Sequence, residues 1–268
     1  MRVDYHTHHY RCRHAEGNLA DYVDAAIAAG FDEIGLSDHS PIYHLGVDPH
    51  PRPWTAMSQL ELPHYVREMQ QVRAAYGGRI TVRLGVESDY VAGWDSHFRE
   101  LWASYPLDYA LGSVHWLYGD WSIFSTALPD GRDREAVYAE YLRCTQLAAR
   151  SGAYEVIGHL DCLKTNGWMP ADWQTPLLAE TVAVIAASGV AIELNASGWR
   201  KPVADCYPRR ELLDMCCRAG IPVTFGSDAH RPDQVAFQWE RAAALLREVG
   251  YREMATFAGR KRTMVPIG

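Results

Sequence analysis

The sequence predicts one α/β domain in which seven strand and helix pairs form a closed, barrel-like parallel sheet. Short, almost wholly apolar runs alternate with longer helical patterns along the chain, as expected for βα units whose strands are covered on both faces. No linker, charge block or low-complexity tract interrupts this alternation. The length of 268 residues admits one large barrel or two small domains. The unbroken series favours a single domain over residues 1–268.

The predicted strands are short runs rich in apolar and β-branched residues, bounded by turn-forming residues. They cover Arg2–Tyr5, Glu33–Ser37, Ile80–Val86, Tyr109–Val114, Glu155–Gly158, Val190–Leu194 and Val223–Gly226.

The predicted helices have recognisable ends. Asn18 can cap the first helix, and Gly30 stands where a left-handed residue commonly ends one. Four further helices are followed by Gly152, Gly189, Gly220 and Gly250. The helices are expected over Leu19–Ala29, Gln59–Tyr76, Trp94–Ser104, Arg134–Arg150, Thr175–Ser188, Arg209–Arg218 and Asp233–Val249. The proline-rich stretch Pro49–Pro53 predicts a loop.

A doubly wound open sheet is the alternative that the same alternation allows. In both architectures ligands bind at the carboxyl ends of the strands. The residues that follow each apolar run are therefore the place to look for a site.

Composition and charge disfavour several partners. The 26 basic and 33 acidic residues give a net charge of −7, opposite in sign to that of most nucleic-acid binders. The six cysteines form no C-x-x-C pair, which fits a reduced, cytoplasmic protein. No segment approaches the roughly 18 apolar residues of a membrane span, and the amino terminus has no apolar export signal. We therefore expect neither nucleic-acid nor membrane binding.

Metal-ligand side chains gather at the ends of the predicted strands. Solvated loop starts ordinarily carry Gly, Ser, Asn or Lys, whereas here histidine and carboxylate residues dominate. In strand order the residues are His6 and His8, Asp38 and His39, Glu87, His115, His159, Asn195, and Asp228 with His230. Residues two apart on an extended segment project to the same side. The pair His6 and His8 can therefore bind one cation, and so can the pair Asp228 and His230.

Two further residues complete this pattern. His14 follows the first strand by a short loop that can fold back over the site, and Glu87 is the only carboxylate at a middle strand end. Nine candidates exceed what one ion needs, so two or three divalent ions (zinc, iron or manganese) are expected. The candidates are His6, His8, His14, His39, Glu87, His115, His159, Asp228 and His230. We assign the remaining histidines to the surface or to loops, with His9 at the rim of the site: His9, His44, His50, His64 and His97.

These residues resemble the motifs of the polymerase and histidinol phosphatase (PHP) family of metal-dependent phosphoesterases. The first motif, D-x-H-x-H, is matched by Asp4–His8. The later motifs are matched by Ser37–His39, Gly85–Glu87, Gly112–His115, Gly158–His159 and Ser227–His230. The resemblance spans nearly the whole chain and implies a distorted seven-stranded (β/α)7 TIM-like barrel. Cys12–Gly17 and Asn195–Pro202 are similar to family members that hydrolyse L-histidinol phosphate.

The resemblance also implies how the ligands divide. His6, His8, Glu87 and Asp228 would hold a first ion, and Glu87, His115 and His159 a second, with Glu87 as the bridge. A third ion would be held by His14, His39 and His230. We expect a metal-bound hydroxide to attack phosphorus, with Asp228 orienting it. Asp38 and Asp161 are expected to accept from imidazole N–H groups.

Five residues are candidates for binding a small phosphorylated substrate. Lys164, Arg200 and Lys201 follow strand ends, and Arg200 is the first choice because a guanidinium matches two phosphate oxygens. Glu16 and Asp161 are candidates for the positive amine and the imidazole of L-histidinol phosphate.

Three other functions remain open at this point. The first is a phosphoesterase of the same family acting on nucleotides or other small esters. The second is an amidohydrolase-type C–N hydrolase, whose metal bridge is usually a modified lysine where this chain has Glu87. The third is a metal-dependent module without turnover, which the complete ligand set disfavours.

Overall fold

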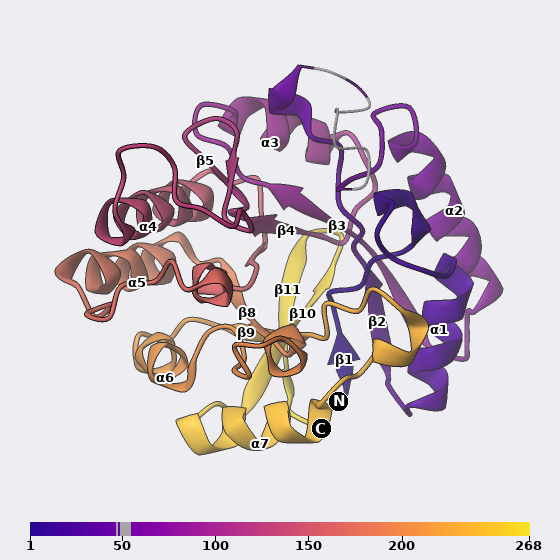
Figure 1. Cartoon of the computed structure of the whole chain (residues 1–268). Coiled ribbons are helices and arrows are strands. Elements are labelled where there is room, and N and C mark those ends of the chain that lie inside the picture. Colours follow the sequence, from indigo (N-terminus) through magenta and orange to yellow (C-terminus); the bar gives the residue numbers. More distant parts are fainter. Residues whose placement is uncertain (47, 49–54) are drawn as a thin grey trace.

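The computed structural model describes residues 1–46, 48 and 55–268, and it shows parallel strands inside a ring of helices (Figure 1). Its main sheet has seven strands in the order β1-β2-β3-β4-β7-β8-β9, and every neighbouring pair is parallel. These strands are β1 (Val3–Asp4), β2 (Glu33–Leu36), β3 (Thr81–Asp89), β4 (Tyr109–Ser113), β7 (Val156–Ile157), β8 (Ala191–Asn195) and β9 (Val223–Gly226). The predicted series of seven strands is confirmed.

The first and last strands of the sheet meet and nearly close the barrel. The Tyr5 amide donates to the Phe225 carbonyl at 2.9 Å, and the His8 amide donates to the Ala229 carbonyl at 2.8 Å. The Ala229 amide returns a bond to the His6 carbonyl at 3.3 Å. A doubly wound sheet would leave these two strands apart, so the TIM-like barrel is confirmed and the open-sheet alternative is wrong.

The helices follow the predicted series with small shifts at their ends. They are α1 (Leu19–Ala28), α2 (Leu62–Ala75), α3 (Asp95–Ala103), α4 (Arg134–Arg150), α5 (Pro176–Ser188), α6 (Arg210–Arg218) and α7 (Trp239–Val249). Helix α7 begins six residues after the predicted Asp233, because Ala236 and Gln238 take left-handed backbone angles with φ of 64° and 57°. The short 3₁₀ turns are η1 (Tyr10–Cys12), η2 (Tyr43–Leu45), η3 (Cys162–Asn166), η4 (Ser197–Arg200) and η5 (Pro232–Gln234).

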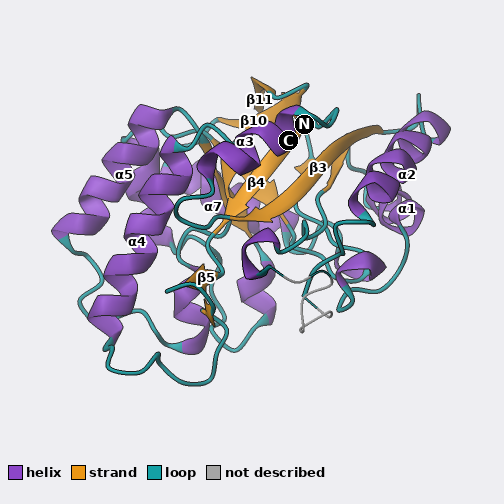
Figure 2. Cartoon of the chain, turned by 90° about the horizontal axis from the view of Figure 1, so that it is seen from above, coloured by secondary structure: helices purple, strands orange, loops and turns teal. Residues whose placement is uncertain are grey.

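Two antiparallel hairpins were not predicted. The first pairs β5 (Trp116–Leu117) with β6 (Trp121–Ser122), directly after β4. The second pairs β10 (Glu253–Ala258) with β11 (Lys261–Pro266), and it lies at the opposite end of the barrel from β5 (Figure 2). The Phe257 amide donates to the Tyr5 hydroxyl at 2.8 Å, and Thr224 donates to the Ala255 carbonyl at 2.9 Å. The β10–β11 hairpin therefore covers the amino end of the barrel.

Tyr109 explains why two interior strand positions are glycine. Its ring crosses the barrel, and its hydroxyl donates to the Tyr5 carbonyl at 2.6 Å. A Cβ added at Gly35 would lie 2.1 Å from the Tyr109 hydroxyl, and one at Gly85 would lie 2.3 Å from its ring. The tyrosine thus ties β4 to β1 across the core, and only glycine leaves it room.

Three further predictions concern the rest of the chain. Among the described residues, no helix combines the length and the apolar content needed to cross a bilayer. All six cysteines lie within the described part of the chain and are free thiols. The predicted loop at Pro49–Pro53, with His50, lies outside the described residues.

Candidate metal centre

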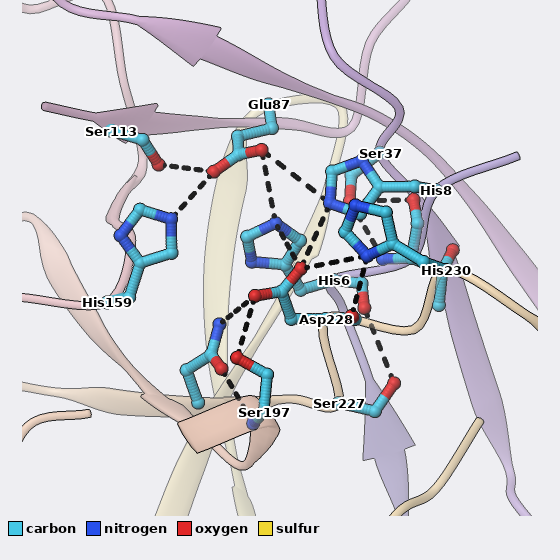
Figure 3. Close-up of polar contacts among 12 residues, drawn as sticks. His6, His8, Ser37, Glu87, Ser113, His159, Ser197, Ser227, Asp228 and His230 are labelled. Atoms are coloured by element: carbon cyan, nitrogen blue, oxygen red, sulfur yellow. Dashed lines mark hydrogen bonds and ion pairs between the residues drawn. The ribbon is translucent and has the colours of Figure 1, made fainter. Parts of the chain in front are cut away.

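The nine predicted ligands meet at the carboxyl end of the barrel. His6 and His8 directly follow β1, and the other strand-end residues follow β2, β4, β7 and β9. Glu87 lies within β3, which runs three residues further than its apolar stretch, and the backbone of Glu87 bridges to that of His39. Figure 3 shows the imidazoles of His6 and His8 facing both Glu87 and Asp228, with His230 beside Asp228. The parallel sheet thus collects residues that are far apart in the sequence.

Four side-chain atoms face one another at the centre of this cluster. His8 Nε2 lies 3.3 Å from Asp228 Oδ1 and 3.6 Å from Glu87 Oε2. His6 Nε2 lies 3.4 Å from Glu87 Oε2 and 3.9 Å from Asp228 Oδ1. Zinc bonds of about 2.0–2.1 Å in tetrahedral geometry place ligand atoms roughly 3.3 Å apart. The spacing fits a cation held by these four residues.

The unsatisfied polar atoms of the cluster give an independent test of that fit. Among the described residues, the buried atoms His6 Nε2 and His8 Nε2 have no hydrogen-bond partner, whereas Glu87 Oε2 lies 2.8 Å from His39 Nδ1. Buried polar atoms are normally paired, because leaving one unpaired costs about 1–3 kcal/mol. His6, His8 and Glu87 also offer ligand atoms that all lie within 4.8 Å of one another. A divalent cation bound to Glu87 Oε2 would satisfy both nitrogens at once.

The two oxygens of Glu87 face different partners. Oε2 faces His6 and His8, whereas Oε1 lies 2.9 Å from His159 Nε2 and 3.6 Å from His115 Nε2. His115 Nε2 and His159 Nε2 are themselves 3.1 Å apart. This two-sided arrangement is that of a carboxylate able to bridge two ions.

A third group of imidazoles lies beside the first. The Nε2 atoms of His14 and His230 are 3.0 Å apart, and the rings of His14 and His39 have centroids 5.2 Å apart. His39 also directs Nδ1 at Glu87 Oε2 over 2.8 Å. His8, His39 and His230 together offer atoms within 4.8 Å. The structure therefore brings the three residues expected for a third ion together, with His39 next to the bridging carboxylate.

The opposite nitrogen of several imidazoles is held by an acceptor outside the centre. Glu193 accepts from His6 Nδ1 at 2.7 Å, and Asp89 accepts from His115 Nδ1 at 2.7 Å. Asp38 Oδ1 lies 3.4 Å from His8 Nδ1, in the position expected for it. An acceptor at Nδ1 leaves the Nε2 lone pair directed at the centre, which is how proteins orient metal-binding histidines.

The charges of the cluster compensate one another. Burial would raise the pKa of Glu87, but His6, His39 and His115 hold that pKa well below its usual value. Burial would lower the pKa of His39, but Glu87 and Asp38 raise that pKa to about 9. Burial and the neighbouring His39 lower the pKa of His14 to about 4. Protons on some histidines thus offset the buried carboxylates, and cations can take over that role when they bind.

Two of the basic residues predicted to bind the phosphate lie beside the cluster. Arg200 and Lys201 line a cavity of about 360 Å³ together with Glu87, His159 and Asp228. Both terminal nitrogens of Arg200 are directed at backbone carbonyls, those of Ser227 and Asp228. Lys201 Nζ is 4.0 Å from Asp228 Oδ2, and its side chain is one-third exposed. Lys201 is therefore the freer of the two to meet an anion.

Three other candidates do not reach this cavity. Lys164 is buried and bound to Asp161 at 3.0 Å, to Asp205 at 2.8 Å and to a backbone carbonyl. Asp161 binds Lys164 and also accepts a hydrogen bond from the Arg209 amide at 3.0 Å. These contacts join neighbouring loops, so Asp161 does not orient an imidazole as expected. The Glu16 side chain is exposed and does not line the cavity. The ion pairs between neighbouring loops explain why Lys164 and Asp161 are held outside the cavity.

His9 is also placed differently from its prediction. It is buried rather than at the rim, with Nδ1 2.5 Å from Asp38 Oδ2 and its ring 5.1 Å from that of Tyr65. His9 therefore helps to fix the carboxylate that faces His8.

A second cavity adjoins the first. It measures about 340 Å³, shares His14, His39, His115 and Phe124 with its neighbour, and continues toward the β5–β6 hairpin. Ile42, Trp116 and Phe124 give it apolar and aromatic walls, and Asp89 contributes a carboxylate. This cavity fits a small group that is both aromatic and positively charged.

The family profile described as the PHP domain matches residues 4–197. The chain belongs to the PHP domain family. This PHP domain chain is 37% identical over 262 residues to the probable histidinol-phosphatase of Deinococcus radiodurans, covering 96% of this chain and 97% of that protein. It is 29% identical to the histidinol-phosphatase of Bacillus subtilis, covering 90% and 97% respectively. The crystal structure of Lactococcus lactis histidinol phosphate phosphatase, complexed with zinc, L-histidinol and phosphate, superposes with a TM-score of 0.83 at 25% identity and covers 98% of both chains.

Sequence reasoning missed two residues of this PHP domain site. Glu193 lies inside an apolar run and is buried. Its position could have been noticed from the sequence, because a carboxylate in a buried strand needs a partner. Asp89 stands two residues after Glu87 and so projects to the same side of β3. Both residues hold imidazoles that face the centre.

Proposed function

We propose that this PHP domain protein hydrolyses L-histidinol phosphate to L-histidinol and inorganic phosphate. The observation that carries the proposal is the meeting of all nine predicted ligand side chains at one end of the barrel. It is supported by similarity over nearly the full chain to histidinol-phosphatases. The protein would act as a single domain over residues 1–268 in the cytoplasm, without nucleic acid as a substrate.

The residues divide into three groups for two or three divalent ions, for which zinc, iron and manganese are the candidates. His6, His8, Glu87 and Asp228 would hold one ion, Glu87, His115 and His159 a second, and His14, His39 and His230 a third. Bound divalent ions neutralise phosphate oxygens and, by lowering the pKa of water, supply a hydroxide nucleophile near neutral pH.

Asp228 is held in one orientation by its surroundings. Its Oδ2 accepts from Ser197 Oγ at 2.9 Å and from Asn195 Nδ2 at 3.3 Å, which leaves Oδ1 facing His8. Its backbone takes a left-handed conformation with φ of 52°, and Arg200 donates to its carbonyl. We assign Asp228 the role of orienting the attacking water, and Arg200 the role of holding the Asp228 loop in place.

We assign Lys201 the role of binding the substrate phosphate. We expect Lys201→Ala to raise KM for the substrate and Ki for inorganic phosphate about tenfold, because one charge-assisted bond to the phosphate is lost. Steady-state phosphate release and product inhibition measure the two constants. Lys261→Ala, which removes an exposed lysine from β11, is the matched control. Unchanged KM and Ki in Lys201→Ala would remove Lys201 from phosphate binding.

The second cavity is where we place the leaving group. L-histidinol carries an imidazole ring and an ammonium group, and the cavity offers aromatic walls with the Asp89 carboxylate. Phe124 is 45% exposed and lines this cavity, and its ring lies 5.4 Å from that of His115. Phe124 would thus recognise the ring. Asp89, whose oxygens also bind His115 and Trp116, would supply the negative charge for the amine in place of Glu16 or Asp161.

Phe124→Ala tests this assignment. We expect kcat/KM for L-histidinol phosphate to fall about tenfold, because ring stacking and burial worth about 1–1.5 kcal/mol are lost. The rate with 2-aminopropyl phosphate, which keeps the amine but lacks the ring, should not change. Equal losses with both esters would mean that Phe124 shapes the site without contacting the ring.

The proposed reaction is tested by a substrate panel. The protein is reconstituted with manganese, zinc or iron, and kcat/KM for L-histidinol phosphate is compared with the values for other small phosphomonoesters. A preference of a hundredfold, about 2.7 kcal/mol of selective transition-state binding, supports the proposal. Similar rates on many esters, or on nucleotides, would identify a phosphoesterase of broad specificity instead.

A further inference from the structure

Glu193 is a buried carboxylate that lies behind the proposed metal centre. It projects from β8, its residue is 0% exposed, and it is not one of the nine proposed ligands. Oε1 accepts from His6 Nδ1 at 2.7 Å. Oε2 accepts from the backbone amide of His159 at 2.9 Å and from Asn195 Nδ2 at 3.1 Å. One side chain thus binds residues from three strands or strand ends.

The neighbouring strand makes room for this carboxylate. A Cβ added at Gly226 of β9 would lie 1.9 Å from Glu193 Oε1 and 2.6 Å from the Cβ of His6. A side chain at position 226 would therefore push Glu193 away from the imidazole. Glycine at this position allows the carboxylate to sit against His6.

The contact with His6 decides which nitrogen of the ring faces the centre. A carboxylate only accepts, so the proton of a neutral His6 must reside on Nδ1, and the Nε2 lone pair is left toward Glu87 and Asp228. The other tautomer would place a lone pair against Glu193 Oε1.

The contact with His159 acts on its backbone. This residue has a φ of 21°, a conformation that ordinary residues rarely adopt, and its amide is held by Glu193 Oε2. Its Nε2 lies 2.9 Å from Glu87 Oε1, on the side of Glu87 away from His6. Asn195 extends the same network to Asp228 Oδ2 over 3.3 Å.

We propose that Glu193 is a positioning residue that prepares both proposed ion positions bridged by Glu87, although it contacts neither ion. It sets the tautomer of His6 at the first position and the backbone of His159 at the second. The inference rests on the metal centre of the proposed function. It states that one carboxylate, Glu193, prepares both positions for binding an ion.

The test measures metal binding and tautomer rather than activity. Wild type, Glu193→Gln and Glu193→Ala are titrated with Zn²⁺ against a chromophoric chelator, and their metal content per chain is determined. We expect Glu193→Ala to bind zinc roughly 10–100-fold more weakly, the loss typical of removing a partner that orients a ligand. Glu193→Gln should bind with intermediate affinity, because its amide oxygen still accepts from His6 while its NH₂ group cannot accept from the His159 amide.

The tautomer is read from the ¹⁵N spectrum of histidine-labelled, metal-free protein at alkaline pH, because only the neutral ring has a tautomer. Burial would lower the pKa of His6, but the neighbouring carboxylates Glu193, Glu87 and Asp228 raise that pKa well above its usual value. The His6 signal is identified by its loss in His6→Gln. Wild type should show the proton on Nδ1, and Glu193→Ala should show a mixture of tautomers. Glu33→Gln is the matched control: Glu33 is 1% exposed, lies on β2 and binds Tyr5 and Arg83 rather than an imidazole. It should keep wild-type zinc affinity and the Nδ1–H form.

Wild-type zinc affinity together with an unchanged His6 tautomer in either Glu193 variant would overturn the inference. If Glu193→Ala does not fold, Glu193→Gln preserves side-chain volume and decides alone. Neither readout involves substrate, so failure of the proposed reaction would show separately, as zinc-loaded wild-type protein that releases no phosphate from L-histidinol phosphate.

Discussion

Glu87→Ala is expected to lower kcat for L-histidinol phosphate on the order of 10³-fold or more, a loss of about 4 kcal/mol of transition-state stabilisation. The reason is geometric: one oxygen of Glu87 faces His6 and His8, and the other faces His115 and His159. Removing this side chain takes one ligand from each of two proposed ion positions. Phosphate release and elemental analysis of the purified protein measure both consequences.

Two further variants sharpen the interpretation of Glu87→Ala. Glu87→Gln keeps the volume and one acceptor oxygen, so it should retain the ion at one position better than at the other. Glu155→Gln removes a half-buried carboxylate that binds the Ala110 amide and Arg260 near the amino ends of the strands, and it should leave metal content and kcat unchanged. An active Glu87→Ala protein with full metal content would exclude Glu87 as the bridge.

Most of the candidate metal ligands could be predicted because they lie at strand ends, and His14, from the loop after β1, is the exception. His39 and Glu87 each follow an apolar run, and parallel strands carry such positions to one edge whatever the loops do. Their distance in the sequence therefore did not matter. The number of strands in the barrel and their order followed from the same regular alternation.

The partners supplied by loops could not be predicted in this way. Lys164 follows a strand end just as Lys201 does, yet Asp205 from another loop holds Lys164 in a buried ion pair. Phe124 reaches the cavity only because a short hairpin turns back after β4. Such contacts depend on how loops pack on one another, which periodicity does not describe.

Asp4→Ala is expected to reduce the free energy of unfolding by about 3–5 kcal/mol, because at least two backbone donors lose their acceptor in the protein interior. Asp4 is 0% exposed and joins β1 to the segment after β9. Its Oδ1 accepts from the Ser227 amide at 2.9 Å, and its Oδ2 accepts from the Ala236 amide at 2.9 Å. Urea unfolding of the chelator-treated protein measures the loss without a contribution from bound metal.

Asp32→Ala provides the contrast for Asp4→Ala. Asp32 also accepts a backbone bond, from the Arg2 amide at 2.7 Å, but it is exposed, so water can replace it and the expected loss is about 0.5 kcal/mol. Equal losses in the two variants would show that burial of the Asp4 bonds is unimportant. Because Ser227 immediately precedes Asp228, Asp4→Ala should also weaken zinc binding. The Asp of the D-x-H-x-H motif would then act as the clamp that closes the barrel and places the last strand's ligands beside those of the first.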